Sequence, residues 1–121
     1  MTPPCRIPPD RDPEVTRTVY AVGRDLGVSE KVMPAAFEAG WVESHMNNLD
    51  CGDKDSLGVF QQRPSQGWGT PEQIMRVPYA AERFFRRAVD VERRAPHLTA
   101  GGTAQEVQRS GHPDRYDAAE A

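Results

Sequence analysis

Residues 41–62, WVESHMNNLDCGDKDSLGVFQQ, decide the fold of this chain. They place Glu43 at the end of an apolar run, and a polar loop separates it from the tetrad Gly-Val-Phe-Gln at 58–61. At about 100° per residue, a helix through the apolar run puts Glu43 within about 60° of Ala36, inside the apolar stripe. This pattern favours a carboxyl group that points inward. The alternative is a glutamate in a frayed last turn that reaches solvent.

A helix is predicted over residues 29–44, SEKVMPAAFEAGWVES, leading into this stretch. Ser29 opens it. Pro34 lies in the first turn of a helix that starts late, or it bends a helix that starts earlier. On the same helical wheel Glu38 lies opposite the apolar stripe and is predicted to face solvent, whereas Trp41 is predicted to join the core.

An inward carboxyl group at the end of a helix has a specific use. Burial and the negative end of the helix dipole both disfavour the ionised form, so we expect a raised pKa for Glu43. A carboxylic acid still protonated near neutral pH is what general-acid cleavage of a glycosidic bond requires. Glu43 is therefore the candidate for proton transfer.

The rest of the chain predicts helices joined by short loops. Asp12 as N-cap and Pro13 at the first helical position predict a helix that Gly27 ends. Thr70 and Gln73 form a capping-box pattern at the start of a short helix. An amphipathic helix follows at 78–95, and the residues expected to contribute to its core face are Tyr79, Phe84, Phe85, Ala88 and Val89.

The end of the chain and the loop after Glu43 complete the predicted fold. Thr103 is expected to cap a short helix through Ser110, and Pro113 to start a terminal one. Residues 45–62 are expected to form a small hairpin that turns at CGDKDS. The expected class is mainly α (α+β), a helical domain with a small β-hairpin flap. An extended arm at 1–12 precedes one domain at 13–121.

Length and composition narrow the class of protein. The chain has 121 residues, 37% of them hydrophobic, which suits one domain with a modest core. No apolar run approaches the roughly 18 residues of a membrane span, so we expect no membrane insertion. A net charge of −3 argues against nucleic acid as a partner, and we expect a monomer. The opening MTPPCRIPPDRDP lacks a signal-peptide pattern, so any secretion signal was removed or never belonged to the chain.

The chain has two cysteines, Cys5 and Cys51, and both lie in loop-like sequence beside Pro, Arg, Asp or Gly. A disulfide between the arm and the loop after Glu43 is the simplest interpretation, and it implies an oxidising compartment. The expected location is therefore outside the reducing cytoplasm. The alternative is two unrelated free thiols.

A Glu-Ser pair closing an apolar helix, followed by SLGVFQ at 56–61, resembles the lysozyme-like lytic transglycosylases. That family includes soluble lytic transglycosylases and goose-type lysozymes. The run GDKDSLGVFQQRPSQGWGTPEQIM at 52–75 is especially similar to lysozyme-like domains of actinobacterial secreted proteins. The resemblance spans about residues 14–118. It implies a lysozyme-like fold whose hairpin flap lies beside an active-site groove.

The resemblance also implies roles for individual residues. Glu43 becomes the catalytic acid and base, and Ser44 supports the end of its helix. AQEVQRSGHPDRY at 104–116 occupies the place of the family's Asn-Ala-Gly region, although the chain has no Tyr-Asn-Ala-Gly string. The implied substrate-binding residues are Ser56, Gln61, Gln62, Trp68, Gln108 and Tyr116.

The function implied is cleavage of the β-1,4 bond between N-acetylmuramic acid and N-acetylglucosamine in peptidoglycan, with a 1,6-anhydromuramoyl product and no cofactor. Peptidoglycan glycan strands are then the partner, and the location that the resemblance implies is extracellular or associated with the cell wall. A hydrolytic lysozyme is one alternative, with a second carboxylate from Asp50, Asp53 or Asp55. A non-catalytic peptidoglycan-binding module is another, and a cytosolic partner-binding helical domain is a third.

The remaining polar features favour ordinary structural roles. Asp50, Asp53 and Asp55 suit a hairpin turn better than a calcium loop, so no metal site is predicted. His45 is expected to be exposed beyond the helix end. Trp68 either stacks on a sugar ring or pins its loop to the core. A basic cluster is expected to form a salt-bridged solvent face that can also attract an anionic wall, and it comprises Arg83, Arg86, Arg87, Arg93 and Arg94.

Overall fold

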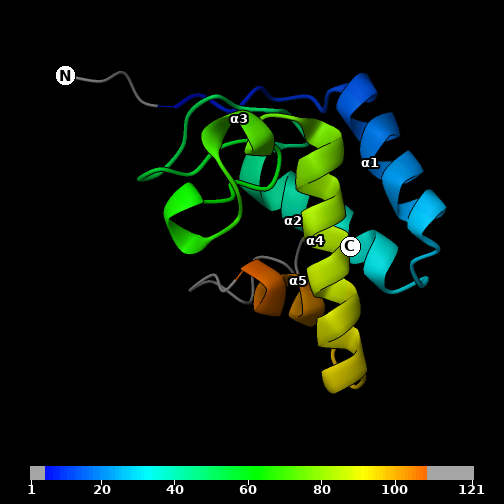
Figure 1. Cartoon of the computed structure of the whole chain (residues 1–121). Helices are drawn as coiled ribbons and strands as arrows, with labels where there is room; N and C mark the ends of the chain where they lie inside the picture. The colour runs from blue at the N-terminus through cyan, green and yellow to red at the C-terminus, as the bar shows by residue number, and fades with distance from the viewer. Residues whose placement is uncertain (1–4, 109–121) are drawn as a thin grey trace.

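The computed structural model describes residues 5–108, and these are mainly helical, as predicted (Figure 1). Five α-helices and a 3-10 turn follow one another along this part of the chain, and their bounds are α1 Pro13–Leu26, α2 Val32–Ser44, η1 Pro64–Gln66, α3 Pro71–Ile74, α4 Val77–Arg94 and α5 Ala100–Gln108. None of the helices in residues 5–108 has the length and apolar character needed to cross a membrane.

Helix starts and stops follow the local sequence. The Asp12 carboxylate accepts hydrogen bonds from the backbone N–H groups of Glu14 (2.9 Å) and Val15 (3.3 Å), and Gly27 ends α1 with a left-handed φ of 68°. Thr70 and Gln73 form both hydrogen bonds of the capping box that opens α3. These predicted boundaries are confirmed, because capping depends on residues within one turn of the helix end.

Helix α2 begins at Val32, so Pro34 lies in its first turn, which is the first of the two predicted alternatives. Two predictions made from its helical wheel are wrong. Glu38 is buried, with 5% of its surface exposed, whereas Trp41 is 40% exposed. The physical reason is that α2 packs against α1, α4 and α5, so that it has no single core face and no single solvent face.

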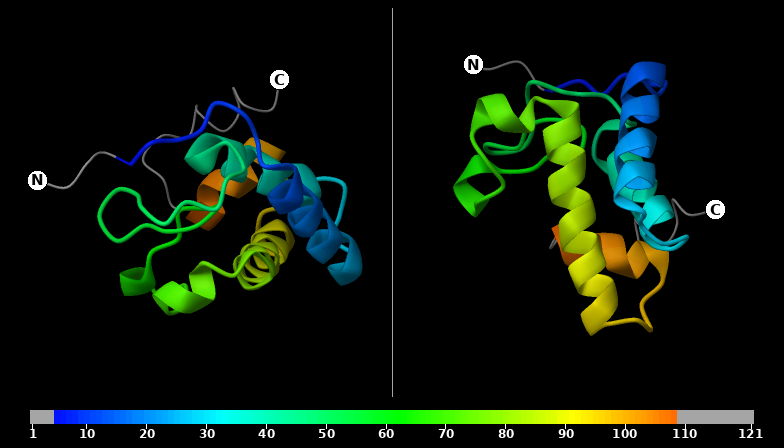
Figure 2. Two further views of the ribbon diagram at one scale, coloured as in Figure 1. Left: turned by 90° about the horizontal axis from the view of Figure 1, so that it is seen from above. Right: turned by 45° about the vertical axis from the view of Figure 1, so that its right-hand side comes forward.

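Helices α1, α4 and α5 pack around α2. Figure 2 shows α1 (blue) beside α4 (yellow-green), with α5 (orange) crossing the C-terminal half of α4. Within α4, Phe84, Phe85 and Ala88 are buried as predicted, while Tyr79 and Val89 are half-buried. The hydrophobic core lies between these four helices.

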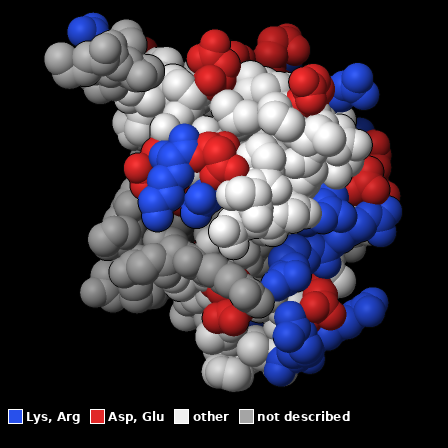
Figure 3. Space-filling model, turned by 60° about the vertical axis from the view of Figure 1, so that its left-hand side comes forward, with Lys and Arg blue, Asp and Glu red and all other residues white. Residues whose placement is uncertain are grey.

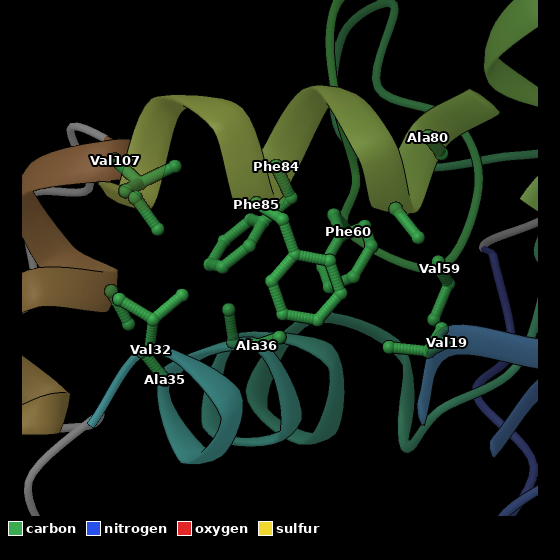
Figure 4. Close-up of a cluster of buried hydrophobic side chains, with 14 of the residues drawn as sticks. Val19, Val32, Ala35, Ala36, Val59, Phe60, Ala80, Phe84, Phe85 and Val107 are labelled. Carbon is green, nitrogen blue, oxygen red and sulfur yellow. The ribbon is translucent and has the colours of Figure 1, made fainter. Parts of the chain in front are cut away.

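The tetrad at 58–61 supplies part of this core. Val59 and Phe60 are fully buried, and the Phe60 ring stacks on Phe84 with centroids 4.7 Å apart. Figure 4 shows these side chains between α4 and α2, with Phe85 next to them. Burial of one such aromatic side chain contributes about 1.5–3 kcal/mol, which ties the loop firmly to the helices.

The hairpin predicted for residues 45–62 is reduced to one antiparallel bridge between Leu57 and Gln62, and residues 5–108 contain no β-strand. Three positive φ angles explain the difference: 56° at Lys54, 81° at Gly58 and 52° at Gln61. Left-handed residues turn the backbone, so the segment folds into successive tight turns and cannot extend a ladder.

The start of α5 also differs from the prediction. The Thr99 hydroxyl accepts the hydrogen bond from the Gly102 N–H (2.9 Å), and the helix begins at Ala100. Thr103 is fully buried inside the helix and is not its cap. It follows Ala100 by one turn on the core face, together with Ala104 and Val107. The predicted end of this helix at Ser110 and the predicted start of a terminal helix at Pro113 lie outside the described residues.

A disulfide between Cys5 and Cys51 fastens the arm to the loop after α2, with Cα atoms 5.5 Å apart, and confirms that prediction. His45 Nδ1 hydrogen-bonds the Pro8 carbonyl (2.9 Å), and its ring stacks on Trp41 at 4.0 Å. His45 is therefore half-buried and not exposed, because the arm and Trp41 cover it.

Candidate active-site groove

A groove of about 820 Å³ opens between the end of α2, the loop at 53–68, α4 and the end of α5. We call it the groove. Its lining is assembled from parts of the chain that are distant in sequence, and comprises Glu43, Asp53, Lys54, Ser56, Gln61, Gln62, Arg63, Gln66, Gly67, Trp68, Arg83, Arg86, Arg87, Asp90, Val107 and Gln108.

Glu43 enters the groove from a helix end that is held in place. The N–H groups of His45 and Met46 donate to the carbonyls of Trp41 (2.9 Å) and Gly40 (3.1 Å), and His45 adopts a left-handed φ of 53°. This closed end opposes fraying. Glu43 is half-buried there and lines the groove.

Ser44 connects this helix end to the opposite wall. It is fully buried, and its hydroxyl lies 2.6 Å from the Val59 carbonyl and 3.1 Å from the Gly40 carbonyl. The shorter contact identifies Val59 as the main acceptor. Ser44 therefore links the helix end that carries Glu43 to the tetrad.

Gln61 lines the groove, but its side-chain amide group also forms hydrogen bonds within the loop that follows α2. Its Nε2 donates to the carbonyls of Cys51 (3.1 Å) and Gly58 (3.0 Å). A Cβ atom on Gly52 would lie 1.9 Å from Gln61 Oε1, so only glycine allows this close approach. Gly52 is a residue that the sequence analysis missed, since nothing local to it predicts the contact.

The two other glutamines also attach the wall to the helices. Gln62 is 2% exposed and donates to the Ala80 carbonyl of α4 (3.2 Å). Gln108 of α5 donates to the Phe60 carbonyl (2.6 Å). Both residues lie at the groove as the resemblance implied, and both hold the backbone of the tetrad between α4 and α5.

Six of the residues that the sequence suggested for catalysis or binding line the same groove. They are Glu43, Ser56, Gln61, Gln62, Trp68 and Gln108. Trp68 is half-buried and packs against the core, which agrees with its pinning the loop, and it also lines the groove. The remaining candidate, Tyr116, lies outside the described residues.

The three loop aspartates have different surroundings. Asp53 lines the groove with Glu43, whereas Asp50 and Asp55 do not. Arg63 Nε donates to Asp55 at 2.5 Å and the Ser65 N–H donates at 2.9 Å. These hydrogen bonds, the one from Arg63 first, hold the pKa of Asp55 well below its ordinary value. Asp53 is therefore the one of the three loop aspartates that shares the groove with Glu43.

No group of three or more His, Cys, Asp or Glu side chains in residues 5–108 is placed to hold a metal ion. The basic cluster is exposed as predicted, and salt bridges join Arg86 to Glu82 and Arg94 to Asp90, each at 2.9 Å. The sequence analysis did not anticipate that part of this cluster lines the groove. The i, i+3, i+4 spacing of Arg83, Arg86 and Arg87 shows that they share one face of the helix. It does not show that this face lines the groove.

Comparison with known proteins adds no relative: no family model matches the chain, and no curated protein is significantly similar to it in sequence.

Proposed function

We propose that this protein cleaves the β-1,4 bond between N-acetylmuramic acid and N-acetylglucosamine in peptidoglycan, as a lytic transglycosylase. One observation carries the proposal: Glu43 and five of the six residues expected to bind sugar, although up to 65 positions apart in the chain, line one groove. The Cys5–Cys51 disulfide fits action in an oxidising compartment, at the cell wall or outside the cell.

The proposed chemistry uses Glu43 twice. Its protonated carboxyl group donates a proton to the bridging oxygen as the bond from that oxygen to C1 of N-acetylmuramic acid breaks. The carbonyl of the 2-acetamido group stabilises the positive charge that develops at C1. The Glu43 carboxylate then accepts the proton of the C6 hydroxyl, and the C6 oxygen bonds to C1. The product is a 1,6-anhydro sugar, no water is consumed, and Glu43 regains its proton.

Hydrolysis is the second candidate, because Asp53 lines the same groove as Glu43. In that reaction one carboxyl group protonates the leaving oxygen and the other activates water or forms a covalent intermediate. Both reactions require Glu43, and the two differ in the new sugar end that they produce.

Digestion of purified peptidoglycan by the wild type and by the Glu43→Gln variant tests the proposal. Glutamine keeps the shape of the side chain but cannot transfer a proton. We expect release of soluble fragments to fall by at least about 100-fold. Glu30→Gln is the control, since Glu30 is exposed in the turn between α1 and α2, outside the groove.

Mass spectrometry of the fragments separates the two reactions. Anhydro ends that disappear in Glu43→Gln support the transglycosylase, whereas reducing ends identify a hydrolase. Absence of fragments with the wild type refutes an enzymatic function and leaves a peptidoglycan-binding module. Equal activity of wild type and Glu43→Gln refutes the role of Glu43.

A further inference from the structure

The groove has a basic wall on a protein whose net charge is −3. Its lining includes five basic side chains and three acidic ones. Two of the basic groups are neutralised by neighbours, since Arg63 pairs with Asp55 (2.5 Å) and Arg86 pairs with Glu82 (2.9 Å). The other three basic groups are Lys54, Arg83 and Arg87.

These three side chains carry positive charge that residues 5–108 do not neutralise. Neither Lys54 nor Arg87 forms an ion pair there, and Arg83 donates only to the backbone carbonyl of Gly67 (3.1 Å). Arg83 and Arg87 are one helical turn apart on α4, and both are exposed. Figure 3 shows a band of Lys and Arg side chains along α4 on this face of the molecule.

We infer that Arg83 and Arg87 bind carboxylates of the substrate, so that the groove selects glycan strands carrying free carboxylates over neutral strands. The inference rests on the proposed function and adds its substrate class. A guanidinium group presents two parallel donors that match a carboxylate, and exposed arginines keep their charge at any physiological pH. Neutral β-1,4-linked N-acetylglucosamine polymers present no group of this kind.

Two kinds of carboxylate occur on peptidoglycan strands. One is the lactyl group of N-acetylmuramic acid when no peptide is attached, and the other is the set of free carboxylates on the attached peptides. Both offer the same chemistry to Arg83 and Arg87. They can be separated by removing the peptides with an amidase, which exposes lactyl carboxylates and eliminates those of the peptides.

The test measures binding to insoluble peptidoglycan in the Glu43→Gln background, so that cleavage does not consume the strand. Arg83→Gln/Arg87→Gln removes the two charges from the groove. Arg76→Gln/Arg93→Gln is the control variant. It removes two positive charges near the two ends of α4, at exposed positions outside the groove. Each protein is sedimented with native, amidase-treated and carboxyl-amidated peptidoglycan.

We expect the groove variant to bind native peptidoglycan about tenfold more weakly than the control variant, as the loss of two exposed charge-assisted contacts implies. The difference should vanish on carboxyl-amidated material and at about 1 M salt, where the screening length is about 3 Å. A difference that grows after amidase treatment, which increases the number of free lactyl carboxylates, assigns the contact to lactyl carboxylates, and loss of the difference assigns the contact to the peptides.

Equal binding of the groove and control variants to native peptidoglycan overturns the inference, as does a difference that survives carboxyl amidation. These results are independent of the cleavage assay. If Glu43→Gln stops cleavage while the arginine variants bind alike, the proposed function stands and the carboxylate inference falls. If Glu43→Gln still cleaves but the binding difference appears, the proposed role of Glu43 falls and carboxylate binding stands.

Discussion

At the scale of single residues, Ser44 determines where Glu43 lies. Its hydroxyl joins α2 to the Val59 carbonyl at 2.6 Å, and it also accepts the Asn47 N–H at 3.2 Å. A buried hydroxyl that serves as donor and acceptor costs little while both partners are present. Its removal leaves the Val59 carbonyl without this donor in a site that water does not reach.

Ser44→Ala is therefore expected to lower the free energy of unfolding by about 1–3 kcal/mol. Urea denaturation followed by circular dichroism measures the change. Cleavage of peptidoglycan should fall as well, because the helix end that carries Glu43 loses its link to the tetrad. Glu30→Ala, at an exposed position outside the groove, is the control. A variant as stable as the wild type would show that the Val59 contact contributes nothing.

Asp55 gives a prediction about acid stability. Its pKa is lower in the folded protein than in the unfolded chain, because Arg63 and Ser65 donate hydrogen bonds to the carboxylate. The ion pair therefore stabilises the fold above the ordinary Asp pKa of about 4, and this contribution is lost as the pH falls below that value.

We expect Asp55→Asn to be less stable than the wild type near neutral pH, and the gap to close as the pH falls from about 4 toward 2. Urea midpoints measured across this range provide the comparison. Asp50→Asn changes an exposed residue of the same loop and is the control. The same closing gap in the control would attribute the effect to overall charge and not to the Arg63 pair.

At the scale of elements, the loop at 45–62 keeps its shape without a β-ladder. Val59 and Phe60 anchor it in the core, and the Gln61 side chain fills the space over Gly52. An alanine Cβ at 52 would lie 1.9 Å from Gln61 Oε1 and 2.7 Å from the Ser56 carbonyl oxygen, so a side chain and the backbone would both have to move.

Gly52→Ala is expected to destabilise the protein by about 1–3 kcal/mol and to reduce cleavage, because Ser56 and Gln61 both line the groove. The melting temperature and the rate of fragment release measure the two effects. Gly102→Ala is the control, since an added Cβ would lie 3.2 Å from the Thr99 hydroxyl and 3.5 Å from Leu98, with no contact under 3 Å. An unchanged melting temperature for Gly52→Ala would contradict the tight packing.

The elements also show what the sequence can predict. Caps such as Asp12 and Thr70 act within one turn, so their helix boundaries were predictable. Glu38, Trp41 and Thr103 were misplaced because their surroundings come from helices distant in sequence. The candidate site divides in the same way. The Glu-Ser pair and the tetrad identified Glu43 and the glutamines by resemblance, but the approach of Arg83 and Arg87 to the groove depends on how α4 packs.

At the scale of the whole molecule, the disulfide joins residues 46 positions apart and links the arm to the loop that borders the groove. A crosslink over this distance restricts the unfolded chain, which stabilises the fold by about 2–4 kcal/mol. The Cys5→Ala/Cys51→Ala variant should therefore unfold at a lower urea concentration than the oxidised wild type, because its free energy of unfolding is lower by about 2–4 kcal/mol. Reduced wild type should match the variant, and equal midpoints for oxidised and reduced wild type would refute the prediction.

The hydrogen bond from Gln108 to the Phe60 carbonyl has a consequence for the order of assembly. It joins residues 48 positions apart, and contacts between distant parts of a chain form after local helices do. When the nascent chain extends only to the end of α4, Glu43 and the tetrad have been synthesised, but α5, which donates the hydrogen bond to Phe60, has not. Since Val107 and Gln108 are part of its lining, the groove is complete only in a chain synthesised through Gln108.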